Sequence, residues 1–169
     1  MDPLVSLVAL IEPQDLNAVS PVPQTIKDRD LPELADLYLD AYAGGASDPD
    51  AAGAAASIHA VFAGARGAVI PQASMLSRDV EGRITAAIIT TERTFRSDKP
   101  KTAFIAELFT HPDQRGRGLA ELLLRHAMQA LHESGYKTLA VTINSANAAA
   151  QALYLRRDFR RFTPAVPID

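Results

Sequence analysis

A loop rich in glycine and arginine carries the clearest chemistry in this sequence. The surrounding segment, ELFTHPDQRGRGLAELLLRHA, starts at Glu107, and a turn at 111–113 leads into an amphipathic helix. The free N–H groups in the first turn of a helix carry partial positive charge, glycines let an anion approach them, and arginines add forked donors. We therefore expect a pyrophosphate to bind here. The loop consists of Arg115, Gly116, Arg117, Gly118, Leu119 and Ala120.

Two common phosphate-binding loops do not match this segment. A Walker loop ends in Gly-Lys-Ser or Gly-Lys-Thr, which is absent, and the dinucleotide fingerprint needs a third glycine where this chain has Glu121. The alternative explanation is that the two glycines serve only a tight turn. The arginines and the strand–turn–helix order favour the anion site.

Asn147, Ala150 and Tyr154 are candidates for a second part of the same site. They are spaced by three and four residues, so they share one face of a predicted helix. Asn147 and Tyr154 would lie about 10 Å apart along the helix axis, which suits contacts with two points of an extended ligand. From spacing alone, Tyr154 is better explained as a core residue with an internal hydrogen bond.

Glu107 is the only charged residue in the stretch AFIAELFT. Strand alternation places its side chain on one face with Ile105 and Phe109, opposite Phe104, Ala106 and Leu108. A carboxylate in apolar surroundings is costly unless it faces a cleft or a partner, and burial raises its pKa toward values that suit a general base. A catalytic base and a structural partner for an arginine both remain open.

The order of predicted elements indicates an α/β fold with a mixed, mostly antiparallel sheet flanked by helices. The first helix starts at an Asp30 cap and ends before Gly44, and the second starts at an Asp50 cap. Periodicity and turn residues predict strands at 25–27, 73–78, 83–91, 102–110, 138–143 and near 159–166, and further helices at 51–64, 118–134 and 147–157.

Residues 1–23 are predicted to form an N-terminal arm and a proline-containing linker, followed by one domain at 24–169. The apolar stretch from Leu4 to Ile11 is too short for a membrane span, and Asp2 stands where a secretory signal needs positive charge. We expect the arm to dock on the domain or on a partner subunit.

Composition excludes several classes of function. The 169 residues are 47% hydrophobic with a net charge of −3, which fits one globular domain and disfavours a non-specific nucleic-acid binder. The absence of cysteine excludes disulfides and a thiol nucleophile, and it suits a cytoplasmic location. The four histidines lack metal-binding spacing, so we predict no metal and no membrane or nucleic-acid partner.

Together these motifs resemble the GCN5-related N-acetyltransferase (GNAT) superfamily over about residues 24–160. Its phosphate signature is Arg or Gln, two residues, Gly, one residue, then Gly or Ala. Its usual ending is similar to NAAAQALYLRRDF, except that Asp158 replaces a glycine in the local turn. The residues that match are Arg115, Gly118, Ala120, Asn147, Ala150, Leu153, Tyr154 and Phe159.

The resemblance implies that strand 102–110 splays from the parallel strand 138–143. The pantetheine arm of acetyl-CoA would enter that gap and pair with the backbone of Leu108, Phe109 and Thr110. The resemblance also implies Tyr154 as the general acid, with an acidic residue such as Glu107 as the base, often through water. The acetyl group would pass directly to an amine of a small molecule or peptide, and a homodimer is left open.

Three other functions remain open at this stage. The same fold could serve as a non-catalytic acyl-CoA sensor, or as an enzyme that acetylates a lysine or an N-terminus of a protein. The third is an interaction module whose apolar arm, Leu4 to Ile11, is the functional element.

Overall fold

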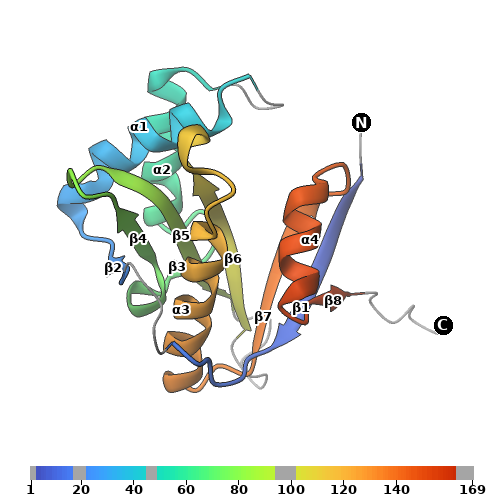
Figure 1. The fold of residues 1–169 in the computed structure, drawn as a ribbon. Coiled ribbons are helices and arrows are strands. Elements are labelled where there is room, and N and C mark those ends of the chain that lie inside the picture. Colours follow the sequence, from blue (N-terminus) through green and yellow to red (C-terminus); the bar gives the residue numbers. More distant parts are fainter. Residues whose placement is uncertain (1–2, 17–21, 45–48, 94–101, 163–169) are drawn as a thin grey trace.

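Eight strands form one mixed sheet in the computed structural model, which describes residues 3–16, 22–44, 49–93 and 102–162 (Figure 1). The strand order is β2-β4-β5-β6-β7-β1-β8, with β3 beside β5. Neighbours pair antiparallel except β6 and β7, which are parallel. The strands are β1 (Leu4–Leu10), β2 (Gln24–Thr25), β3 (Ala68–Val69), β4 (Met75–Arg78), β5 (Ile84–Arg93), β6 (Thr102–Thr110), β7 (Thr138–Asn144) and β8 (Arg160–Arg161). The α/β fold with splayed central parallel strands that the sequence predicts is confirmed.

Within the described ranges, four α-helices pack on the two faces of the sheet: α1 (Leu31–Tyr42), α2 (Ala51–Phe62), α3 (Leu119–Glu133) and α4 (Ala148–Arg156). Figure 1 shows α3 and α4 on one face, and α1 and α2 on the other face over the β4–β6 half. The buried stripe Leu123, Ala127 and Leu131 of α3 repeats every four residues and packs in one core cluster with residues of β6, β7 and β1. The helices α1 and α2 form a second cluster with β4, β5 and β6. None of the described helices is long and apolar enough to cross a bilayer.

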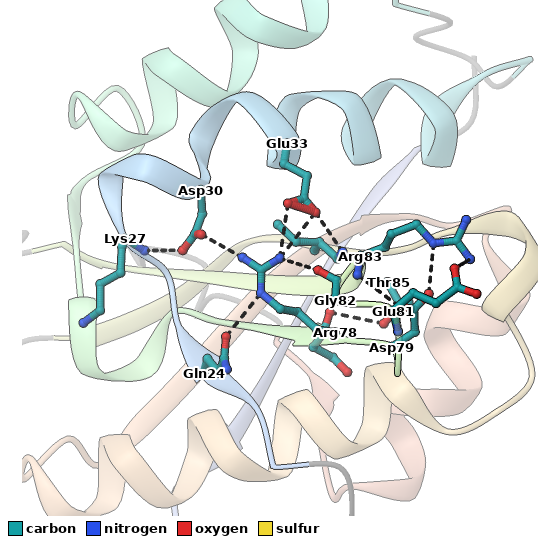
Figure 2. A network of polar contacts seen from close by, with 12 residues as sticks. Gln24, Lys27, Asp30, Glu33, Arg78, Asp79, Glu81, Gly82, Arg83 and Thr85 are labelled. Carbon is teal, nitrogen blue, oxygen red and sulfur yellow. Dashed lines mark hydrogen bonds and ion pairs between the residues drawn. The ribbon is translucent and has the colours of Figure 1, made fainter.

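Arg78 fixes the start of α1 against the β4–β5 hairpin (Figure 2). Its guanidinium donates to Asp30 Oδ1 at 2.8 Å, to Glu33 Oε1 at 3.2 Å and to the carbonyl oxygen of Gly82 at 2.7 Å. Glu33 Oε2 also accepts the backbone N–H of Ile84 at 2.9 Å. Asp30 precedes α1, but its carboxylate does not cap the helix; its Oδ2 instead accepts from the backbone N–H of residue 27. These contacts hold one end of α1 to the sheet, and its other end carries Tyr42.

The N-terminal segment forms an internal strand of the sheet. Leu4–Leu10 (β1) pairs with β7 along its whole length and with β8 on its other edge. Leu7, Ala9 and Ile11 are buried in the α3-side core, whereas Leu10 is 72% exposed. We expected this segment to dock either on the domain or on a partner subunit, and in the structure it docks on the domain. The core sheet therefore includes β1 and begins before residue 25, where we had predicted its first strand.

The remaining elements follow the sequence expectations with small differences. The strand expected at 73–78 begins at Met75, because Pro71–Ala73 forms a 3₁₀ turn. The short β3 was missed, since two residues leave no periodic pattern. The strand expected near 159–166 is observed at Arg160–Arg161, and residues 163–166 lie outside the described residues. The Asp50 cap is confirmed by its side-chain bond to the N–H of Gly53.

Leu7→Ala should destabilise the protein, because the substitution leaves a cavity in the core cluster that Leu7 shares with α3 and β7. We expect a loss of about 2–5 kcal/mol in the free energy of unfolding, measured by chemical denaturation. The matched control is Leu10→Ala on the same strand, which should change stability by no more than about 0.5 kcal/mol. Equal effects of the two changes would contradict the placement of β1 in the sheet.

Candidate active site

The gap between β6 and β7 originates at a bulge in β6. The two strands pair at only three positions, from Ala103↔Leu139 to Ile105↔Val141, although both continue further. The β5 partner of Ile105 is Thr90 and the partner of Glu107 is Ile89, so the residue between them is unopposed. A bulge bends its strand, and Figure 1 shows β6 and β7 diverging toward one end. Beyond residue 105, β6 keeps β5 as its only pairing partner among the described strands.

The same bulge corrects the predicted orientation of Glu107. Alternation places Glu107 on one face with Ile105, but the extra residue shifts the pattern by one position. Ile105 packs in the α3-side core, whereas Glu107 pairs with Ile89, which belongs to the core under α1 and α2. The shared face with Phe109 is confirmed, because Phe109 lies in the same α1-side core.

The predicted phosphate loop has the backbone geometry of an anion site. Gly116 and Gly118 both have φ = +79°, a left-handed conformation that glycine adopts without strain. A Cβ atom at either position would meet no atom within 4 Å, so the loop faces open space. Gly118 is the N-cap of α3, and no side chain of the described residues caps that end. The N–H groups of the first turn of α3 are therefore available to an anion.

One cleft of about 720 Å³ joins this loop to the end of β6 and to α4. The following predicted site residues line it: Leu108, Phe109, Thr110, Arg115, Gly116, Gly118, Leu119, Ala120, Asn147 and Tyr154. Tyr42 and Glu121 also line the cleft, although they were not among the predicted binding residues. The structure thus brings together residues from β6, the loop, α3, α4 and the end of α1.

Arg117 and Asn147 differ from the other predicted binding residues. Arg117 is exposed and does not line the cleft. Asn147 lines the cleft, but its Oδ1 accepts the N–H of Ala150 at 3.1 Å, so it caps α4. Arg115 lines the cleft and donates to the carbonyl oxygen of Ala41 at 2.7 Å, which ties the loop to the end of α1.

Tyr154 lies at the inner wall of the cleft on α4. The residue is 3% exposed, and its ring packs 5.0 Å from that of Phe159. Burial, and secondarily the charge of Glu107, raises the pKa of Tyr154 and keeps it protonated. Among the described residues, no hydrogen-bond partner is found for its hydroxyl, so the internal bond expected of a core tyrosine is not observed there.

Glu107 lies behind Tyr42 rather than in the cleft wall. Tyr42 Oη donates to Glu107 Oε2 at 2.8 Å, and Arg66 Nη1 donates to Oε1 at 2.9 Å. The carboxylate side chain is 13% exposed and that of Arg66 is 45% exposed. Burial raises the pKa of Glu107, and the two donors oppose that effect.

We did not predict from the sequence that Arg66 and Tyr42 both contact Glu107. Tyr42 is the last residue of α1 and was not among the predicted site residues, but its hydroxyl binds Glu107. Arg66 stands 41 positions from Glu107 in a short loop, and no local pattern connects the two.

Gly118→Asp should weaken CoA binding by about tenfold or more, because it adds negative charge where phosphate must meet the loop amides. Aspartate tolerates the left-handed conformation better than most residues, so the variant should fold. Isothermal titration with CoA measures the effect. Gly135→Asp is the control, since Gly135 follows the other end of α3 with φ = +87° and equally open surroundings. Unchanged affinity in folded Gly118→Asp would place the phosphate site elsewhere.

The comparisons with known proteins agree with this geometry. The acetyltransferase (GNAT) family matches residues 31–159, whereas no curated protein matches the chain. A GNAT-family acetyltransferase structure from Novosphingobium aromaticivorans is 21% identical with a TM-score of 0.65, covering 95% of this chain and 60% of its own. The chain thus spans less than two thirds of that protein.

Two further solved structures have named acceptors. The ribosomal-protein-S18-alanine N-acetyltransferase of Escherichia coli is 24% identical, with a TM-score of 0.62 and coverage of 84% of this chain and 79% of its own. AAC(6′)-Iy, solved with the bisubstrate analogue CoA-S-monomethyl-acetylneamine, is 16% identical, with a TM-score of 0.63 and coverage of 88% and 96%. These likenesses show the fold, and the family match covers most of the chain. The chain belongs to the acetyltransferase (GNAT) family.

Proposed function

We propose that the chain is an acyl-CoA-dependent N-acyltransferase that transfers acetyl from acetyl-CoA directly to an amine. One observation carries this proposal: the anion loop, the unpaired side of β6 and Tyr154 all line a single cleft. A CoA thioester has the three matching parts, namely a diphosphate, an amide-bearing arm and a sulfur. The nucleotides of a Walker loop and the dinucleotides of the three-glycine fingerprint lack the amide-bearing arm and the sulfur.

The binding residues fit CoA part by part. The amides at the start of α3, with Gly116, Gly118 and Arg115 around them, would hold the diphosphate. The backbone of Leu108, Phe109 and Thr110 would pair with the pantetheine amides as an added strand, because β5 is the only described strand that pairs with β6 at these positions. Asn147 would contact the arm through its amide nitrogen, since its Oδ1 caps α4. Arg117, which lies outside the cleft, would act only as a nearby positive charge.

The chemistry would be performed by two side chains. Tyr154 would donate its phenolic proton to the thiolate sulfur as the C–S bond breaks, and its raised pKa keeps that proton in place at neutral pH. Glu107 would accept a proton from the acceptor ammonium through water, so that the amine nitrogen can attack the thioester carbon. No acyl-enzyme is required. A backbone N–H of residues 108–110 would stabilise the oxyanion.

The Tyr154 hydroxyl, which has no hydrogen-bond partner among the described residues, favours an enzyme over an acyl-CoA sensor. A sensor needs only packing at this position, whereas a general acid needs a donor that is not already bonded within the protein. The acceptor is an amine of a small molecule or of a peptide. Among the similar structures, one acetylates a ribosomal-protein alanine and another binds an aminoglycoside-based analogue, so both classes belong in the test. The cytoplasmic location and a homodimer stay predictions.

An acceptor screen tests the proposal directly. Release of free CoA from acetyl-CoA is followed by thiol detection, and acceptor mass is measured in parallel. The panel contains neamine, a polyamine, a lysine peptide and a peptide with an N-terminal alanine. Acceptor-dependent thiol release with matching acetylation supports the enzyme. Tight CoA binding without turnover on any amine would favour the sensor.

Tyr154→Phe should lower kcat by about 10²-fold, the low end of general-acid contributions, because thiolate is a tolerable leaving group. CoA affinity should change little, since the hydroxyl acts mainly as charge develops on sulfur. The measurement is kcat with the best amine from the screen, with CoA affinity determined separately.

Tyr136→Phe is the matched control. Its hydroxyl donates to Glu92 Oε1 at 2.6 Å, and the residue does not line the cleft. It should keep the wild-type kcat even if its stability falls. A wild-type kcat in Tyr154→Phe, under conditions where chemistry limits turnover, would make Tyr154 a packing residue.

A further inference from the structure

We propose that Arg66 is a positioning residue for the transfer reaction, held by the loop between α2 and β3 so that its guanidinium orients the Glu107 carboxylate. The inference rests on the proposed base role of Glu107. It assigns a purpose to a residue outside the cleft and outside the motifs of the sequence. Arg66 acts through the carboxylate and does not itself touch the reacting atoms.

The geometry around Glu107 leaves the carboxylate little freedom. Its two oxygens have different partners: Arg66, from the α2–β3 loop, donates to Oε1, and Tyr42, at the end of α1, donates to Oε2. A carboxylate held at both oxygens has one rotameric position, while each oxygen retains a lone pair for a water or an amine. The pair therefore fixes where a proton can be accepted.

The loop that carries Arg66 is held against β5 at several points. The carbonyl oxygen of Arg66 accepts from Arg93 Nε at 3.1 Å, and the guanidinium of Arg93 lies 4.9 Å from the centre of the Phe104 ring. Gly67 has φ = +105°, and a Cβ there would lie 2.6 Å from the carbonyl oxygen of Glu92. Only glycine allows this approach, after which β3 pairs with β5.

The charges that face Glu107 show why a cation is needed. Tyr42 and Tyr38 face it from α1, Tyr154 from α4 and Arg66 from the loop. The three tyrosines are neutral at physiological pH, so Arg66 is the positive charge in this set. Burial raises the pKa of Glu107, and Arg66 and the Tyr42 hydroxyl lower it. Without Arg66 the carboxyl would protonate at higher pH and lose its capacity to accept a proton.

The experiment is the pH dependence of kcat/KM with the best acceptor. Because a base must be ionised, removing Arg66 should move the acidic limb of the profile to higher pH. Arg66→Gln should lose about tenfold or more in kcat/KM near the wild-type limb, and return to within about twofold of wild type at high pH. Arg66→Lys should be intermediate, since it keeps the charge but loses the forked geometry. A merely structural role would lower the rate at every pH.

Two further variants complete the test: one moves the Arg66 loop without replacing Arg66, and the other is a control. Gly67→Ala leaves Arg66 in the chain but displaces its loop, so it should shift the limb in the same direction. Arg83→Gln is the control, because Arg83 is an exposed arginine that pairs with Asp79 and Glu81 on the β4–β5 hairpin. It should leave the profile unchanged. Thermal unfolding of each variant confirms that it is folded.

Glu107→Gln separates this inference from the proposed function. If the limb survives in Glu107→Gln, the base role fails and the role of Arg66 fails with it. If Glu107→Gln abolishes the limb and Arg66→Gln leaves it in place, Glu107 remains the base and only the Arg66 assignment is overturned. A higher kcat with a lower acceptor KM in Arg66→Gln would also overturn the Arg66 assignment. It would show that Arg66 competes with the acceptor amine for the Glu107 carboxylate.

Discussion

A single extra residue in β6 determines both the shape and the chemistry of this site. The bulge at Ala106 coincides with the last β6–β7 pair, at Ile105, and a bulged strand bends away from its neighbour. The bend leaves one side of β6 without a strand partner, which is where an amide-bearing ligand can add. The same insertion turns Glu107 from the α3 face to the α1 face, where Tyr42 and Arg66 meet it. Without the bulge, the sheet would close and the carboxylate would point into an apolar core.

The site lies where two differently built halves of the sheet meet. On one side, β4, β5 and β6 are covered by α1 and α2 and fixed by the Arg78 network. On the other side, β7 is supported by β1, so the N-terminal strand helps to hold the far wall of the gap. Two contacts connect the elements around the cleft. Arg115 donates to the end of α1, and Glu121 of α3 accepts from Arg157 Nε, at the end of α4, at 3.0 Å. These ties let α1, α3 and α4 present their residues to one ligand.

Local patterns in the sequence were enough to predict most elements and the glycine turn that leads into α3. The helix stripes, the Asp50 cap and the glycines before Leu119 each depend on neighbours within a few positions, so periodicity and turn chemistry reveal them. Interactions between distant segments were not accessible in that way. The bulge inverted the predicted face of Glu107, because alternation assumes a regular strand. The Arg66–Glu107 pair and the insertion of β1 beside β7 depend on how remote segments meet in space. Arg117 was assigned from its place in the glycine-rich loop, and only the fold shows that it lies outside the cleft.

In our proposal, the unpaired side of β6 and the start of α3 bind one CoA molecule together. Backbone hydrogen exchange, measured with and without saturating CoA, tests this joint site. We expect slower exchange at residues 108–110 and 118–121, with no change in the hairpin at 79–83 or along β1. Protection at the start of α3 alone, or protection confined to β1, would contradict it, because the ligand would then not occupy the gap that the bulge opens.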